Sequence, residues 1–432
     1  MKTGCMLLIF ALVSGGIAFA QGPLTPPLGA NAEVGPVNVL SPGGAPQATM
    51  KTLHQVEPRI PIASLPFSIT ESGSYYFTGN LTFAVGTGHA IQVAASDVTI
   101  DLMGFTLDSE SAVTGSGIHL GSGIRNVTVR NGTIGGTSSV LVQETSPEVA
   151  DWLVGATGGF TSGVGFAENL SPPRIGHLQD LVVRGCRGFG CLVPDESIVE
   201  RCRAMDNVGG GFVARFSSFR DCNASQNMGV GGFYSPLAGC KYLGCTANFN
   251  SPWGFGTYSA TFSHCTALTN KSGFEAANST LSHCTASGNQ EYGIRASSGT
   301  VSHCSTELNK FDGIIVEKGT VTGCTARRNK WAGIAAFGGQ VSDSTAVENE
   351  RDGIFAPYAR VTGCKVSDNH RWGIYADHAV IIECHATTNN TLNNPLNGGI
   401  YCDDSVVSHC FSKNNFVIQY QIGSGATADA NR

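Results

Sequence analysis

Hydrophobic and polar positions repeat with a period of about twenty residues from Cys202 to Asn415. One unit reads V-x-x-C-x-A-x-x-N-x-x-x-G-I, and its apolar positions fall in three short runs separated by turn-forming residues. Runs this short, rich in β-branched residues, predict three brief β-strands per unit. A fixed period of this size is typical of a solenoid, in which each unit buries its apolar face only against its neighbours.

The length of the repeat excludes the common helical solenoids. Ankyrin and tetratricopeptide repeats need helices and about 33 or 34 residues, and leucine-rich repeats need a leucine frame that this chain lacks. Crossovers between parallel strands are almost always right-handed. The sequence therefore predicts an all-β fold, a single-stranded right-handed parallel β-helix (solenoid) with about 20-residue coils. The strands are expected to form three parallel sheets, with about 4.8 Å between coils.

A cysteine recurs at one position of each coil, and Ser344 takes its place once. A free thiol that points inward behaves as a small apolar residue, so the series predicts a ladder in the core. Parallel stacking keeps the Cβ atoms about 4.8 Å apart, wider than the roughly 3.8 Å that a disulfide prefers, so most thiols are expected to be free. One or two bridges stay open for the cysteines off the ladder, namely Cys186, Cys191, Cys240 and Cys402. The ladder comprises Cys202, Cys222, Cys245, Cys265, Cys284, Cys304, Cys324, Cys364, Cys384 and Cys410.

An asparagine follows each ladder position five residues later. Asparagine tolerates left-handed backbone, and its amide can bond the asparagines above and below it, so this series predicts a ladder at a turn. The asparagines are Asn207, Asn227, Asn250, Asn270, Asn289, Asn309, Asn329, Asn349, Asn369, Asn389 and Asn415.

The segments outside the repeat differ in character. Residues 1–20 carry one lysine, an apolar stretch and a small-x-small ending, which is the pattern of a secretory signal peptide. Residues 21–49 are rich in proline and glycine and predict a linker. Longer alternating strands over residues 50–134 predict an N-terminal cap and the first coils. A broken rhythm predicts a long inter-coil excursion at 135–180, regular coils follow at 181–420 with a short insertion at 387–398, and residues 421–432 are expected to form a C-terminal tail.

The charge and hydropathy of the chain limit the kinds of partner that it can bind. Charged residues make up 13% of the chain and the net charge is -6, so no basic surface is present to neutralise a phosphate backbone and nucleic acid is not expected. No segment after the signal peptide has the roughly eighteen uninterrupted apolar residues of a membrane span. The signal peptide predicts a secreted protein, in the periplasm, at the cell surface or outside the cell. No cofactor is predicted, and the sequence indicates no oligomeric state.

Aromatic residues gather between each asparagine and the next glycine, where consecutive coils place them in a vertical stripe that holds three of the four tryptophans. The residue after Gly-Ile is expected to face outward beside them. Rings can stack on sugars while neighbouring charged groups bind hydroxyls or uronate carboxylates, so the pattern predicts a polysaccharide as partner. In the alternative interpretation the rings cover turn backbone, because scattered exposed apolar residues need no function. The predicted carbohydrate-binding residues are Trp253, Tyr292, Phe311, Trp331, Trp372, Phe355, Tyr375 and Tyr401.

Two aspartates are candidates for catalysis. Asp312 and Asp352 lie two coils apart, so their backbones are expected roughly 10 Å apart, near the upper end of the about 6.5–9.5 Å carboxyl separation of inverting glycosidases. Arg351 and Arg371 lie close to them in the stripe. The alternative is that aspartates in Asp-Gly turns serve the turn itself.

Three histidines, His264, His283 and His303, precede successive ladder cysteines. They are expected to stack outside the core as a solvated row. The adjacent thiols should point inward and no carboxylate accompanies the row, so no metal site is predicted.

The coils, together with Val98-Thr-Ile-Asp-Leu-Met-Gly-Phe-Thr-Leu and Asn126-Val-Thr-Val-Arg-Asn-Gly-Thr-Ile, carry a family resemblance. The chain resembles the secreted bacterial right-handed parallel β-helix repeat proteins of the pectate-lyase-like superfamily, over about residues 50–415. The resemblance implies the β-helix fold and a superfamily whose enzymes cleave polysaccharides, although many repeat-only members have no established activity.

The catalytic motifs of the superfamily are mostly missing. Of the polygalacturonase motifs only Asp403-Asp404 is present, without its companions, and no dense carboxylate cluster for calcium accompanies an arginine. The sequence therefore favours a non-enzymatic glycan-binding or surface and structural module. The alternative is a polysaccharide lyase or glycoside hydrolase of the same superfamily.

Overall fold

The computed structural model describes residues 59–146, 149–166, 173–237, 239–392, 394–415, 418–423, 425 and 427–429. The predicted signal peptide, the linker and the first residues of the predicted cap lie outside these described residues. Within the described part every regular element is a β-strand, and no helix there could span a membrane.

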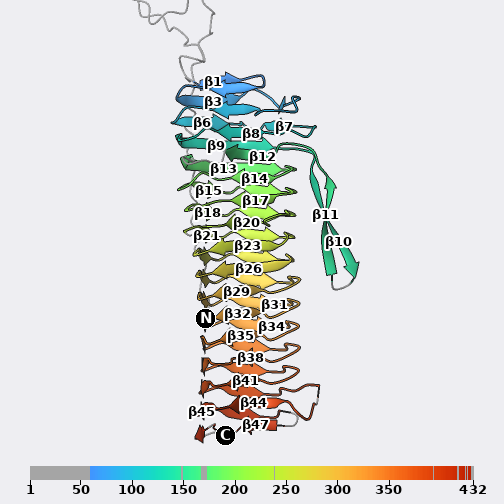
Figure 1. Cartoon of the computed structure of the whole chain (residues 1–432), viewed down its shortest axis with the longest axis vertical. Coiled ribbons are helices and arrows are strands. Elements are labelled where there is room, and N and C mark those ends of the chain that lie inside the picture. Colours follow the sequence, from blue (N-terminus) through green and yellow to red (C-terminus); the bar gives the residue numbers. More distant parts are fainter. Residues whose placement is uncertain are drawn as a thin grey trace, which may run out of the picture. The chain divides into compact units, whose positions relative to one another are not determined.

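Each regular coil contributes three short strands. In one coil these are β29 (Ile294–Ser297), β30 (Thr300–Ser302) and β31 (Ser305–Glu307), and in the next β32 (Ile314–Glu317), β33 (Thr320–Thr322) and β34 (Thr325–Arg327). Corresponding strands pair in parallel and in register, so the coils stack in a column (Figure 1). The predicted parallel β-helix is confirmed.

The three strand stacks form two sheets rather than three. The stacks of second and third strands join into one 30-stranded sheet, because β9 (Arg125–Ile134) and β13 (Arg174–Arg184) run through both. The first strands form a separate 16-stranded sheet, called the front sheet below. Its members are β2 (Phe67–Ile69), β5 (Ile91–Val93), β8 (Ser116–Leu120), β12 (Ser162–Phe166), β14 (Phe189–Leu192), β17 (Gly210–Val213), β20 (Phe233–Ser235), β23 (Trp253–Tyr258), β26 (Ser272–Ala277), β29, β32, β35 (Ile334–Phe337), β38 (Ile354–Phe355), β41 (Ile374–Asp377), β44 (Gly398–Asp403) and β47 (Ile418–Ile422).

Side chains of the same type stack inside the column. All fourteen described cysteines are buried and free, as the spacing argument predicts for the ladder. The thiols of the ladder cysteines bond nearby carbonyl oxygens, as Cys304 Sγ does to Ser302 O at 3.3 Å. In the middle coils Phe233, Phe255 and Phe274 stack with ring centroids 4.8 and 4.7 Å apart. The core is therefore one continuous set of ladders along the axis.

The asparagine ladder exists, but its backbone conformation differs from the prediction. Each Nδ2 donates to the Oδ1 of the next asparagine at 2.8–3.3 Å. The left-handed residue is the one before each asparagine, for example Leu308 before Asn309 and Arg328 before Asn329. The asparagines themselves are buried, with the exposed fraction of Asn309 and Asn329 at 0%. Their role is to satisfy backbone groups of a turn that water cannot reach.

This buried amide also explains the glycine of each coil. A Cβ on Gly313 would lie 2.6 Å from Asn329 Nδ2 and 2.7 Å from Gly333 O. The repeat therefore needs glycine here because a neighbouring backbone and an asparagine amide approach too closely for a side chain.

The predicted excursion at 135–180 has narrower bounds in the structure. An antiparallel hairpin, β10 (Ser139–Ser146) and β11 (Val149–Ala156), stands off one side of the column (Figure 1). Trp152 Nε1 donates to the carbonyl oxygen of Phe249 at 2.7 Å and ties the hairpin to a distant coil. The later part of the segment returns to the coils, because β12 pairs with β8 and β14, and β13 pairs with β9.

The predicted C-terminal tail also contains coil structure. β47 ends at Ile422, and β48 (Thr427–Asp429) pairs in parallel with β45 (Val406–Ser408). The strand stacks thus continue past residue 421, since residues 427–429 supply partners for the exposed edge of β45.

Candidate functional site

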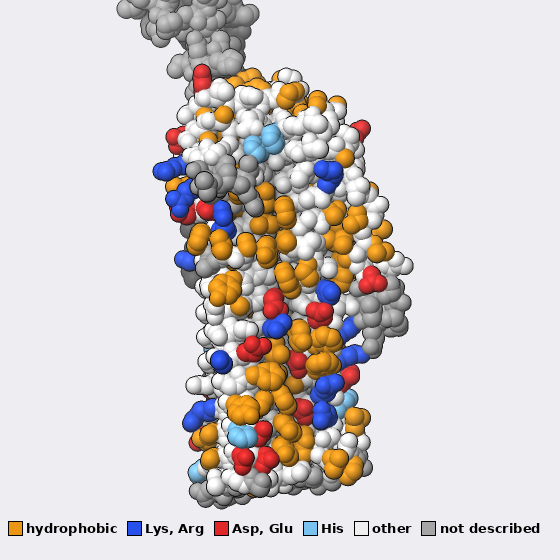
Figure 2. All heavy atoms as spheres, viewed as in Figure 1, with side chains coloured by type: hydrophobic (Ala, Val, Ile, Leu, Met, Phe, Trp, Pro, Cys, Tyr) orange, Lys and Arg blue, Asp and Glu red, His pale blue; other side chains and the backbone are white. Residues whose placement is uncertain are grey.

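Three rings stack on one another along the outer face of the front sheet. Phe355 on β38, Tyr375 on β41 and Tyr401 on β44 occupy the same outward position of consecutive coils. Their centroids are 5.3 and 4.6 Å apart, and Phe337 adds an edge contact to Phe355 at 5.6 Å. Phe337, Phe355, Tyr375 and Tyr401 are called the aromatic row below. Figure 2 shows hydrophobic side chains gathered in a column over this part of the front sheet, with charged side chains at its margins.

A second group of rings lies on the turns that lead into the front sheet. Tyr292 contacts Phe311 edge to face at 5.2 Å, and Phe311 stacks on Trp331 at 4.6 Å. The Arg351 guanidinium lies 4.3 Å from the centroid of Trp331, which is a cation–π distance. These turn aromatics are therefore partly occupied by contacts within the protein.

The two groups contain six of the eight residues predicted to bind carbohydrate. Trp253 lies apart from them, with its nearest ring partner Tyr234 at 6.2 Å. Trp372 has an exposed fraction of 3%, and its ring centroid lies 5.4 Å from that of Tyr401. It therefore packs beneath the outer face rather than on its surface. Sequence reasoning missed Phe337, which alternation along the strand could have found, because it lies two residues beyond the outward-facing Ala335.

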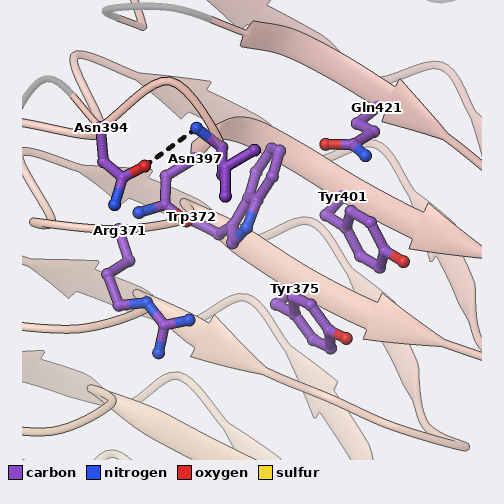
Figure 3. A pocket seen from close by; sticks show the side chains of 8 residues that line it. Arg371, Trp372, Tyr375, Asn394, Asn397, Tyr401 and Gln421 are labelled. Carbon is purple, nitrogen blue, oxygen red and sulfur yellow. Dashed lines mark hydrogen bonds between the residues drawn. The ribbon is translucent and has the colours of Figure 1, made fainter.

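A pocket of about 320 Å³ lies at the end of the aromatic row. In Figure 3, Tyr375, Tyr401 and Gln421 lie on consecutive strands and face Arg371, Trp372 and residues of the loop between Asn389 and Gly398. The loop residues lining the pocket are Asn394, Leu396 and Asn397. The sequence stripe contained Arg371, Trp372, Tyr375 and Tyr401 but not the amides, which come from the insertion and from a coil beyond the last ladder asparagine.

The two candidate catalytic carboxylates are buried and hydrogen-bonded to backbone. Asp312 Oδ1 accepts from Ala332 N at 3.0 Å, and Asp352 Oδ1 accepts from Trp372 N at 3.0 Å. Burial raises the pKa of Asp312 to about 6, and burial likewise raises the pKa of Asp352 although Arg371 Nη1 lies 3.9 Å from its Oδ2. Each carboxylate thus holds the turn of the following coil.

The histidine row lies outside the core as predicted. His264, His283 and His303 are exposed, and successive rings stack with centroids 5.1 Å apart. Within the described ranges, no three His, Cys, Asp or Glu side chains are grouped so that they could hold a metal ion.

The comparisons with known proteins concern the fold. Residues 244–358 match a family model described as "Right handed beta helix region". Among solved structures, the chain is similar to the A-module of the Azotobacter vinelandii mannuronan C-5 epimerase AlgE4, with 13% identity over 83% of this chain and 91% of that chain and a TM-score of 0.38. The periplasmic alginate epimerase AlgG gives 11% identity over 80% of this chain and 78% of that chain, with a TM-score of 0.34. Tailspike protein 3 of bacteriophage CBA120 gives 10% identity over 83% and 56%, with a TM-score of 0.39. No protein with a curated description matches the chain.

At these identities and TM-scores the likeness does not extend to function. The family match and the parallel register of the coils make the chain a right-handed parallel β-helix protein, as its sequence predicts.

Proposed function

We propose that the protein is a carbohydrate-binding β-helix that holds an extended glycan chain against the outer face of the front sheet. The observation that carries the proposal is the aromatic row, in which Phe355, Tyr375 and Tyr401 form a continuous apolar strip that leads into the pocket with Arg371. The proposal includes export from the cytoplasm, which rests on the predicted signal peptide.

The stacking in the row affects how a sugar would bind. Tyr375 has Phe355 against one side and Tyr401 against the other. The row therefore offers ring edges and two phenol hydroxyls at the coil spacing of about 4.8 Å. A polymer with a hydroxyl-rich edge and apolar C–H groups, repeated along its length, suits such a surface. A contiguous exposed apolar patch on a soluble protein is a recognised mark of a binding surface.

Charged side chains at the margins add polar contacts. Arg371 lines the pocket, and Arg295 lies on the same face with Glu275 at 3.6 Å and Glu317 at 3.9 Å. Guanidinium groups donate in a fixed fork that matches carboxylates and paired hydroxyls. Such polar groups fix the orientation of a ligand whose apolar surface lies on the rings.

The test is retention on a panel of immobilised polysaccharides that includes cellulose, xylan, polygalacturonate and alginate. Selective retention of the purified mature chain on at least one of them is expected, and passage through every column without retardation would refute the proposal. The same incubations should be assayed for new reducing ends and unsaturated ends, since these report hydrolase and lyase activity.

A polysaccharide hydrolase or lyase is the second candidate. It is favoured by the pKa of about 6 of Asp312 beside Arg351 and Asp352, because a carboxyl group that titrates near neutrality suits general acid or base catalysis. Binding without cleavage is preferred here, because both carboxylates are buried and each accepts a backbone N–H from the next coil.

A further inference from the structure

The loop between Asn389 and Gly398 is an insertion that is held in place by its own hydrogen bonds. Three residues separate Asn369 from Gly373 in the preceding coil, whereas nine separate Asn389 from Gly399, the glycine in register with Gly373. Asn390 is fully buried under the loop. Its Nδ2 donates to Asn394 O at 2.7 Å and to Asn397 O at 3.0 Å, and its Oδ1 accepts from Asn394 N at 2.9 Å. One buried amide therefore holds both ends of the loop.

The loop supplies one side of the pocket. Asn394 and Asn397 line it opposite the tyrosines of the front sheet (Figure 3). Leu396 also lines the pocket. Asn397 has an exposed fraction of 7%, and its side-chain amide makes no hydrogen bond to any part of the chain that the structure describes. Asn397 therefore offers a side-chain amide that a polar ligand in the pocket can bond.

The pocket also lies beside the last strand of the front sheet that the structure describes. Gln421 on β47 follows Tyr401 in the outward row, and β47 is the last strand of the front sheet in the described residues. A glycan that runs along the row from Phe355 to Tyr401 therefore reaches the loop and Gln421 together. The volume of about 320 Å³ is at the lower end of small-molecule sites, roughly 300–1,000 Å³, which suits one or two sugar units.

We infer that this pocket binds the terminal sugar of the glycan, so that the protein recognises a chain end as well as the side of the polymer. The inference rests on the proposed function. The aromatic row supplies contacts that any stretch of the polymer can make. The pocket supplies Arg371, Asn397 and Gln421 as hydrogen-bonding groups around a single terminal ring, with Tyr401 and Trp372 against its apolar side.

Chain-end recognition is tested with short oligosaccharides of whichever polysaccharide in the panel retains the protein. Three forms are compared by calorimetry: intact, converted to the alditol at the reducing end, and capped at the non-reducing end. The wild type should lose affinity by at least about tenfold for one of the two modified forms, which is the loss expected when a main anchoring contact is removed.

Two variants locate the effect in the pocket. In the first, residues 390–398 are replaced by a three-residue turn, so that Asn389 and Gly399 are separated as Asn369 and Gly373 are. In the second, Asn397→Ala removes only the amide. Both should bind intact and end-modified oligosaccharides equally. Arg360→Ala, an exposed substitution on the other sheet, is the matched control and should keep the preference for one end.

The outcomes separate the two proposals. Equal affinity of the wild type for all three forms, with the polymer still retained, would overturn chain-end recognition and leave the proposed function standing. Loss of the end preference in the control as well as in Asn397→Ala would also overturn the assignment to the pocket. If the wild type is retained on no polysaccharide, the proposed function itself fails, and chain-end recognition fails with it.

Discussion

Asn329 Oδ1 accepts two hydrogen bonds from Asn309, one from its backbone N–H at 3.1 Å and one from its Nδ2 at 2.9 Å. Asn329 in turn donates from its own N–H and Nδ2 to Asn349 Oδ1 at 3.0 and 3.1 Å. Each asparagine thus closes the turn of the coil before it, and the same pair of hydrogen bonds repeats from coil to coil along the column.

Asn329→Ala is expected to lower the free energy of unfolding by about 2–5 kcal/mol, because two buried donors of Asn309 lose their acceptor. Urea denaturation followed by circular dichroism measures the loss. Thr325→Ala, an exposed position of the same coil, is the control and should change stability by less than about 0.5 kcal/mol. Equal effects of the two substitutions would contradict the role assigned to the ladder.

Trp372→Ala and Trp331→Ala should differ in their effect on stability. Trp372 is 3% exposed, so its removal leaves a cavity and is expected to cost about 3–5 kcal/mol. Trp331 is half-buried on the turn surface, so its replacement should lower the free energy of unfolding by clearly less. Thermal unfolding of both variants checks this order, and the reverse order would be inconsistent with the placement of the two rings.

Tyr375→Ala should weaken polysaccharide binding without unfolding the chain. Tyr375 lies between Phe355 and Tyr401 in the aromatic row and stacks on both, so its loss interrupts the strip. A fall in affinity of about tenfold or more is expected in affinity electrophoresis, as for a central anchoring residue. Tyr258→Ala, at a 48% exposed position on β23 away from the row, should bind as the wild type does.

Stability should depend on pH through Asp312. The pKa of this group is about 6 in the folded chain because of burial, against an ordinary value near 4. The folded state therefore binds a proton more tightly than the unfolded state, and its stability falls as the pH rises from about 4 to about 6, by at most about 3 kcal/mol. Asp312→Asn keeps an oxygen for the Ala332 N–H and should remove this part of the pH dependence.

The comparison is made by urea denaturation of the wild type and Asp312→Asn across that pH interval. Asp404→Asn, at an exposed carboxylate, serves as the control and should preserve the wild-type profile. Parallel profiles for the wild type and Asp312→Asn would show that the carboxyl group titrates as it does in the unfolded chain.

The sequence by itself determined the coil and its register. Residues that recur at a fixed period must stack on one another in a solenoid, so the positions of Cys304 and Asn309 in one coil predict those of Cys324 and Asn329 in the next. The same logic brought Phe355, Tyr375 and Tyr401 into one outward row before any contact was known. Local spacing is sufficient here because each coil packs only against its neighbours.

Only the tertiary structure decided the positions of the residues that depart from the repeat. The left-handed conformation falls on Leu308 rather than Asn309, because the buried amide must point into the turn to meet backbone groups. Trp372 turned inward, and Gln421 and Asn397 joined the pocket from segments outside the repeat. Insertions and chain ends have no copy in the next coil, so their positions depend on contacts between residues distant in sequence, which periodicity does not encode.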